Sequence, residues 1–151
     1  MRATEIMTTD PVVCTMHCSA KIVAGVMKEL DIGILPVVEN LNARRLIGVI
    51  TDRDLALRVV AAGRNPATVT AQECMTADPV TCYAEDDAHN VLALMAEHQV
   101  RRIPVVDGNN CILGVVSISD LIRHVAVNAR DLYMVTNRIC EHKLKAWAEA
   151  A

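Results

Sequence analysis

The sequence predicts an α/β fold in which one strand–helix–strand–strand–helix motif occurs twice and the two copies pack with pseudo-twofold symmetry. The evidence is internal repetition within the 151 residues. Met7–Val12 returns as Met75–Val80, and Leu35–Val38 returns as Ile103–Val106, both 68 residues later. An open solenoid needs about three or more repeats to bury a continuous core. Two copies therefore favour a closed pair.

Each copy is expected to begin with a short strand and a helix. The strands, Val12–Thr15 and Val80–Tyr83, follow an Asp-Pro step, which favours extended backbone. In the first copy Ser19 is a suitable N-cap before apolar residues at helical spacing. In the second copy Asp86 or Asp87 takes that place.

Two apolar stretches follow in each copy. Ile34–Val38 and Ile103–Val106 each contain a proline, which predicts a strand start or an edge strand because proline cannot donate to a ladder. Leu46–Ile50 and Ile112–Val116 are continuous apolar runs, typical of strands covered on both faces. The second run returns after 66 residues instead of 68. The loop between the paired strands is therefore two residues shorter in the second copy.

A second helix is expected to begin at Thr51 in the first copy and at Ser117 in the second. The first is expected to end near Gly63, because glycine accepts left-handed backbone. A rough helical stripe continues beyond the repeats and is expected to cap the domain or contact a partner. The expected organisation is a first motif (4–62), a linker (63–71), a second motif (72–127) and a C-terminal helical tail (128–151), with the two motifs folded as one unit.

Composition limits the classes of partner. The net charge of −3 offers no broad basic surface for nucleic acid. No apolar run approaches the roughly 18 residues of a membrane helix, so a membrane is not an expected partner either. The N-terminus lacks the apolar core of a signal peptide. Six cysteines are typical of thiols in a reducing compartment, and we expect a cytoplasmic protein.

Each second helix begins with a hydroxyl residue followed three positions later by an aspartate, as Thr51 with Asp54 and Ser117 with Asp120. A carboxylate at a helix start can accept hydrogen bonds from both hydroxyls of a ribose, and charged acceptors form the stronger bonds. The hydroxyl and the unpaired backbone N–H groups of the same helix end can donate to a phosphate. Ser119 adds a further hydroxyl in the second copy.

The two copies differ just before the proline-containing stretch. Arg101 and Arg102 stand there in the second copy, and Gly33 and Ile34 stand there in the first. Guanidinium groups match phosphate oxygens in a two-pronged manner. The second copy is therefore the better candidate for a phosphate site. Glycine in the first copy leaves room for a base to approach the backbone.

This order of landmarks, found twice over about residues 4–126, resembles the cystathionine beta-synthase (CBS) motif. It is most similar to stand-alone bacterial CBS pairs, including the mycobacterial hypoxic-response type. The resemblance implies a non-catalytic regulatory module with two related clefts between the repeats and no obligatory cofactor. The implied ligand is an adenine nucleotide of the AMP, ADP, ATP, NAD or S-adenosylmethionine class. A flat homodimer formed through the helical faces is also implied.

The resemblance assigns residues to both clefts. In related AMP-binding regulatory subunits, basic residues followed by Ser-h-Ser-Asp mark the phosphate and ribose site, and the second repeat matches that combination. The second cleft is expected to be weaker, because Arg53 lies between its polar partners and Arg101 crowds the base. The expected main cleft comprises Val12, Ile32, Gly33, Ile34, Arg101, Arg102, Ser117, Ser119 and Asp120, and the second cleft comprises Thr51, Arg53, Asp54, Val80, Val100 and Ile103.

A structural interpretation competes with ligand binding at both aspartates. A hydroxyl and a carboxylate at this spacing can simply cap a helix. Aspartate is shorter than the Glu or Gln usual at that position, so it is expected to reach back less well, which favours ligand binding. Arg101 and Arg102 could likewise be a solvated pair at a helix end.

Two further functions stay open. Cys14, His17 and Cys18 could respond to redox change or metal, but this trio lacks a fourth zinc ligand, and no metal site is expected. A tail carrying Trp147 could instead dock on another protein while the clefts stay empty. No nucleophile, base and orienting group occur together, so no catalytic residue and no enzyme activity are expected. The sequence does not indicate which protein is regulated.

Overall fold

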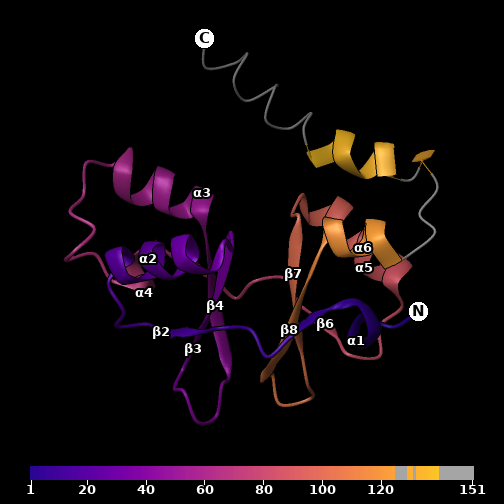
Figure 1. The fold of residues 1–151 in the computed structure, drawn as a ribbon, viewed down its shortest axis with the longest axis horizontal. Coiled ribbons are helices and arrows are strands. Elements are labelled where there is room, and N and C mark those ends of the chain that lie inside the picture. Colours follow the sequence, from indigo (N-terminus) through magenta and orange to yellow (C-terminus); the bar gives the residue numbers. More distant parts are fainter. Residues whose placement is uncertain (125–128, 131, 140–151) are drawn as a thin grey trace. The chain divides into compact units, whose positions relative to one another are not determined.

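The computed structural model describes residues 1–124, 129–130 and 132–139. Over these ranges the chain is a mixed α/β protein with two four-stranded sheets (Figure 1). It divides into two compact units, each built mainly from one repeat. The repeat-one unit contains Asp10–Pro79 and Val106–Leu113, and the repeat-two unit contains Met1–Thr9, Val80–Val105 and the described residues from Gly114 onward.

The repeat-one unit has the predicted order of strands and helices around a sheet of four strands. The sheet order is β2-β3-β4-β5, with β2 parallel to β3 and the other pairs antiparallel. In Figure 1 the turn that joins β3 to β4 lies at the opposite end of this hairpin from α3. The elements are β2 (Cys14–Thr15), α2 (Ala20–Leu30), β3 (Ile34–Val38), β4 (Leu46–Thr51), α3 (Asp52–Leu55), η1 (Ala56–Val60), α4 (Ala71–Cys74) and β5 (Thr76–Ala77).

Helix α2 confirms the predicted cap and apolar face. The Ser19 hydroxyl accepts a hydrogen bond from the backbone N–H of Ile22 (3.3 Å), and the helix ends at Asp31, whose φ of 52° is left-handed. Val23 and Met27 are buried in the core of this unit. The buried face of α2 therefore anchors the helix on the β3–β4 hairpin.

The repeat-two unit repeats this plan. Asp87 is the N-cap of the first long helix, and its carboxylate accepts from the backbone N–H of His89 (2.9 Å). Val135 and Ile139 of a helical segment, 132–139, are buried in the same core. The sheet order is β1-β8-β7-β6. The elements are α1 (Ala3–Ile6), β1 (Thr8–Thr9), β6 (Cys82–Tyr83), α5 (Ala88–His98), β7 (Arg102–Val106), β8 (Ile112–Ser117) and α6 (Ile118–His124).

Each repeat also begins with a short helix and a two-residue strand that were not predicted. These are α1 with β1 and α4 with β5, and each lies in the compact unit formed by the other repeat. Strand β1 pairs with β8, and β5 pairs with β4. Gly114 in β8 makes this approach possible, since a Cβ there would lie 2.5 Å from Met7 Sδ and 2.8 Å from the Thr8 carbonyl oxygen. Elements this short carry too few residues for a periodicity.

The prediction that proline marks a strand start or an edge strand is wrong. Pro36 lies in the middle of β3, opposite Val49, and β3 is flanked by β2 and β4. Proline is tolerated because β2 has only two residues, which pair with Val37 and Val38. Pro36 therefore lies beyond the end of that ladder. Pro104 is likewise inside β7, between β8 and β6.

The turns between the paired strands differ in length as predicted. Residues 39–45 join β3 to β4, whereas residues 107–111 join β7 to β8. Within the repeat-one unit, each turn accepts a hydrogen bond from the first residue of the strand that follows the other turn: Leu46 N–H donates to Asn110 O (2.9 Å), and Ile112 N–H donates to Arg44 O (3.0 Å). Arg44 also forms an ion pair with Asp10 (3.2 Å).

The second helix of repeat one begins at the predicted residue but has an unexpected geometry. Thr51 is its N-cap, and after one α-helical turn the chain continues as the π-helix η1, with Ala61 N–H donating to Ala56 O (2.8 Å). The helix ends before Gly63, whose φ is +66°. Over the described ranges, no helix is long and apolar enough to cross a membrane.

Candidate functional site

Ser117 and Asp120 hydrogen-bond to each other at the start of α6. The Ser117 backbone N–H and hydroxyl both donate to Asp120 Oδ2, at 2.8 Å and 2.6 Å. The Asp120 N–H donates back to Ser117 Oγ at 3.3 Å. The prediction that aspartate reaches back less well is therefore wrong, because the carboxylate of Asp120 accepts a hydrogen bond from the backbone N–H of the N-cap residue at normal length. Both donors of this cap go to Oδ2.

A pocket of about 380 Å³ opens beside this helix start. The Arg101 carbonyl accepts a hydrogen bond from the Ile118 N–H (3.0 Å), which holds the arginine pair next to α6. Two arginines and three hydroxyl residues line it, and such residues suit an anion such as phosphate. Four of the predicted residues are thus brought together. The lining residues are Arg101, Arg102, Ser117, Ile118, Ser119 and Thr136.

Thr136 is a pocket residue that the sequence interpretation missed. It belongs to the helical segment 132–139, which is fixed to the repeat-two core by Val135 and Ile139, exposed by only 7% and 1%. Its hydroxyl donates to the Leu132 carbonyl. The apolar stripe of the tail signalled that this segment packs on the domain, but the tail has no copy in repeat one with which to compare Thr136.

The residues predicted to contact the base in the main cleft lie in the repeat-one unit. Val12 is exposed, Ile32 and Gly33 are half-buried, and Ile34 is buried as the first residue of β3. The Gly33 carbonyl accepts from the Asp52 N–H (3.3 Å). This segment therefore borders the start of α3 in its own repeat, just as Arg101 borders α6, and its contact with the base stays a prediction.

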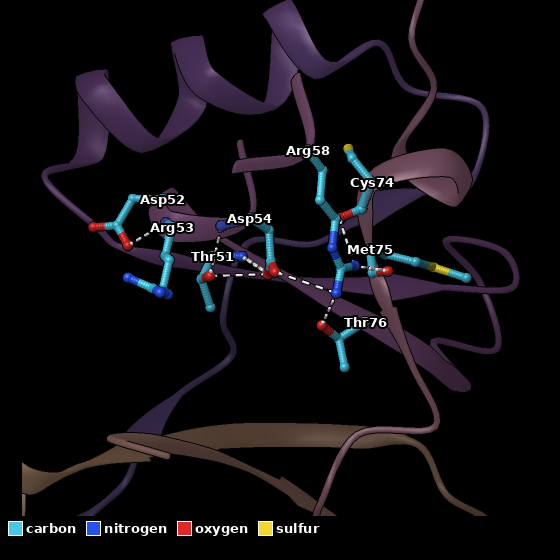
Figure 2. Close-up of polar contacts among 8 residues, drawn as sticks. All are labelled: Thr51, Asp52, Arg53, Asp54, Arg58, Cys74, Met75 and Thr76. Carbon is cyan, nitrogen blue, oxygen red and sulfur yellow. Dashed lines mark hydrogen bonds and ion pairs between the residues drawn. The ribbon is translucent and has the colours of Figure 1, made fainter. Parts of the chain in front are cut away.

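In repeat one, Thr51 and Asp54 form the same cap (Figure 2). The Thr51 N–H and hydroxyl both donate to Asp54 Oδ2 at 2.8 Å, and the Asp54 N–H donates back to Thr51 Oγ1 at 3.1 Å. The exposed Arg53 donates its backbone N–H to Asp52 (2.9 Å). Asp54 Oδ1 also lies 3.7 Å from Nη2 of Arg58, a residue that sequence interpretation did not assign to the site.

The remaining second-cleft residues lie in the repeat-two unit. Val80 and Val100 are half-buried and pack against its core. Ile103 is fully buried within that core, so its side chain serves packing. Their contact with a base stays a prediction.

The thiols were the basis of the alternative metal or redox function. Cys14 is buried, and burial, followed by the neighbouring thiols of Cys18 and Cys74, raises the pKa of its thiol to about 12. His17 is exposed. Among the residues that the structure describes, all cysteines are free and no cluster of three or more His, Cys, Asp or Glu side chains could hold a metal ion. Cys140 and Trp147 lie outside the described residues.

Comparison with known proteins identifies the architecture. The sequence model of the CBS domain family matches residues 3–61 and 71–127. The uncharacterized protein YlbB of Bacillus subtilis is 36% identical over 126 residues, which are 83% of each chain. Hypoxic response protein 1 of Mycobacterium tuberculosis is 35% identical over 127 residues, 84% of this chain and 87% of the relative.

Solved structures with the same fold carry different ligands. The crystal structure of hypoxic response protein I with two coordinated zinc ions has a TM-score of 0.74 at 34% identity, over 83% of this chain and 99% of that one. The CBS domain pair of protein MJ0100, in complex with 5-methylthioadenosine and S-adenosyl-L-methionine, has a TM-score of 0.73 at 24% identity, over 82% of this chain and 94% of that one. At that identity the second likeness shows the fold alone.

Proposed function

The chain belongs to the CBS domain family, and from this membership we propose that it is a non-catalytic regulatory module that binds an adenine nucleotide. The ligand class is AMP, ADP, ATP, NAD or S-adenosylmethionine. One observation carries the proposal: Arg101, Arg102, Ser117 and Ser119 line a single pocket beside Asp120. Cations and hydroxyls for a phosphate therefore adjoin a carboxylate for a ribose.

In this proposal the pocket of repeat two takes the phosphate and ribose. The two guanidinium groups and the Ser119 hydroxyl hold phosphate oxygens. Asp120 Oδ1 accepts hydrogen bonds from the ribose hydroxyls, because Oδ2 is already used by the cap. The base lies against Val12 and the Ile32–Ile34 segment. The second, weaker site uses Thr51, Arg53, Asp54, Val80, Val100 and Ile103.

The regulatory action follows from differential affinity. A nucleotide that contacts both repeats stabilises the arrangement that it binds more tightly, and only that difference shifts the population. We further propose that the protein acts in the cytoplasm as a homodimer. Exposed apolar side chains on the helices support an interface between copies, and they comprise Ile22, Leu30, Leu57, Val60 and Ile122.

Calorimetric titration of the purified protein tests this function. AMP, ADP, ATP, NAD and S-adenosylmethionine are titrated in turn into the wild-type protein and into Arg102→Gln. We expect at least one of the five to bind, and the phosphate-bearing nucleotides to lose more affinity in Arg102→Gln than S-adenosylmethionine does. If none of the five binds the wild-type protein, the proposal is wrong.

A second candidate is a response to zinc, since a relative 34% identical in sequence has been solved with two coordinated zinc ions. In this chain the residues available are Cys14, His17 and Cys18. Metal analysis of the protein as purified, with and without added zinc, separates the two functions. One tightly held zinc per chain that is lost in Cys18→Ser would favour this candidate over nucleotide sensing.

A further inference from the structure

Asp54 and Asp120 differ in the group that lies near Oδ1, the carboxylate oxygen that the cap does not use. Asp54 Oδ1 lies 3.7 Å from Arg58 Nη2, one helical turn further on. Asp120 has no ion pair within the described part of the chain, and His124 stands at the position that corresponds to Arg58. The cap is therefore the same at both aspartates, but the residue four positions later differs: it is Arg58 in repeat one and His124 in repeat two.

Arg58 is held in place independently of Asp54 (Figure 2). Its Nη1 donates to the backbone carbonyls of Cys74 (3.1 Å) and Met75, and its Nη2 donates to Thr76 Oγ1 (3.4 Å). These acceptors belong to the end of α4 and the start of β5. An ion pair between residues four apart on a helix contributes little when both long side chains must be ordered to form it. Here the guanidinium is already ordered by backbone acceptors.

The number of acceptor sites on each aspartate limits how many donors its carboxylate can bind. An ionised carboxylate has about four lone-pair sites, two on each oxygen. In both repeats the cap fills Oδ2 with two donors. A ribose diol that bonds through both hydroxyls needs both sites of Oδ1. Asp120 has no ion pair within the described residues, whereas Oδ1 of Asp54, whose side chain is only 14% exposed, forms an ion pair with Arg58 at 3.7 Å. A ribose hydroxyl at Asp54 would therefore compete with this cation for Oδ1.

We propose that Arg58 determines which aspartate binds a ribose more tightly: its ion pair with Asp54 Oδ1 competes with the ribose hydroxyls and makes the repeat-one site the weaker of the two. This inference deepens the proposed function and rests on it. Arg58 is a positioning residue, because it acts on the site through Asp54.

A gain of binding tests the inference. The background is Asp120→Ala, which removes the repeat-two ribose acceptor, and the probes are AMP and S-adenosylmethionine in separate titrations. Adding Arg58→Gln should raise the affinity for at least one probe by roughly tenfold or more, consistent with a hydrogen bond to a charged acceptor. Adding Asp54→Ala to that double variant should abolish the gain. Loss of a merely structural contact would produce no new binding.

Lys28→Gln in the same background is the matched control. It removes one positive charge from an exposed residue of α2 in the same unit, and no gain is expected. Circular dichroism confirms that each variant is folded, and Arg58→His, which copies repeat two, replaces Arg58→Gln if the latter does not fold.

The outcomes separate this inference from the proposed function. A folded Arg58 variant with no gain, or a gain that persists without Asp54, overturns the inference whatever the wild-type protein binds. A gain in the Arg58 variant together with no binding by the wild-type protein supports the inference and rejects the proposed repeat-two site.

Discussion

Asp120 accepts a hydrogen bond of 2.6 Å from the hydroxyl of Ser117, the last residue of β8. The capping and ligand-binding interpretations of this pair are therefore compatible, because the cap uses Oδ2 and a ribose would use Oδ1. Ser117 also lines the pocket. Any variant at this pair must be judged for stability as well as for binding.

Ser117→Ala is expected to reduce the free energy of unfolding by about 1 kcal/mol, the usual cost of losing a hydroxyl cap. Urea unfolding measures this change. Ser119→Ala is the matched control, because Ser119 is exposed and has no bond in the cap, so its change should stay within about 0.5 kcal/mol. Equal changes in the two variants would show that the cap contributes nothing.

Gly114→Ala is expected to destabilise the protein by roughly 1–3 kcal/mol, as overpacking does. The new Cβ would lie 2.8 Å from the Thr8 carbonyl oxygen, and that backbone atom cannot move aside without disturbing β1. Gly25→Ala is the contrasting variant: no atom lies within 4 Å of its Cβ position. Because Gly25 is inside α2, alanine there should stabilise by about 0.5–1 kcal/mol. Thermal unfolding of both variants checks the opposite signs, and a lower melting temperature for Gly25→Ala would contradict the account.

Stability is expected to fall between about pH 9 and pH 12. Burial raises the pKa of the Cys14 and Cys82 thiols to about 12 from an ordinary value of 9.0. Above pH 9 the unfolded chain therefore releases these two protons before the folded chain does, which favours unfolding. Each thiol contributes a decrease of about 1.4 kcal/mol per pH unit at most. Urea unfolding at pH 8 and pH 10.5 measures the decrease, which should be smaller in Cys82→Ala; an unchanged slope in that variant would reject the assignment.

Repetition made much of the fold predictable. A helix cap such as Ser19 and a continuous apolar run such as Leu46–Ile50 act locally, so their positions could be read from the residues alone. Strand pairing is not local. The pairing of Thr8 with Val115 joins segments more than a hundred residues apart and involves only two residues of β1, too few to leave a pattern.

The candidate site was predictable where the two repeats differ at residues that can bind phosphate. Arg101 and Ser119 stood out because repeat one lacks them, and the structure places both on one pocket. Arg58 and Thr136 were missed for different reasons. Arg58 is ordered by hydrogen bonds to backbone carbonyls, and the sequence does not indicate which carbonyls a side chain will reach. Thr136 lies in a tail that has no second copy for comparison.

The central claim is that Asp120 in repeat two binds the ribose of an adenine nucleotide more tightly than Asp54 in repeat one does. The most direct test is calorimetric titration of Asp120→Asn and Asp54→Asn with whichever of the five nucleotides binds the wild-type protein. The account predicts a roughly 10- to 100-fold loss of affinity for Asp120→Asn, as expected for hydrogen bonds to a charged group. It predicts little change for Asp54→Asn. Unchanged affinity in Asp120→Asn would contradict it.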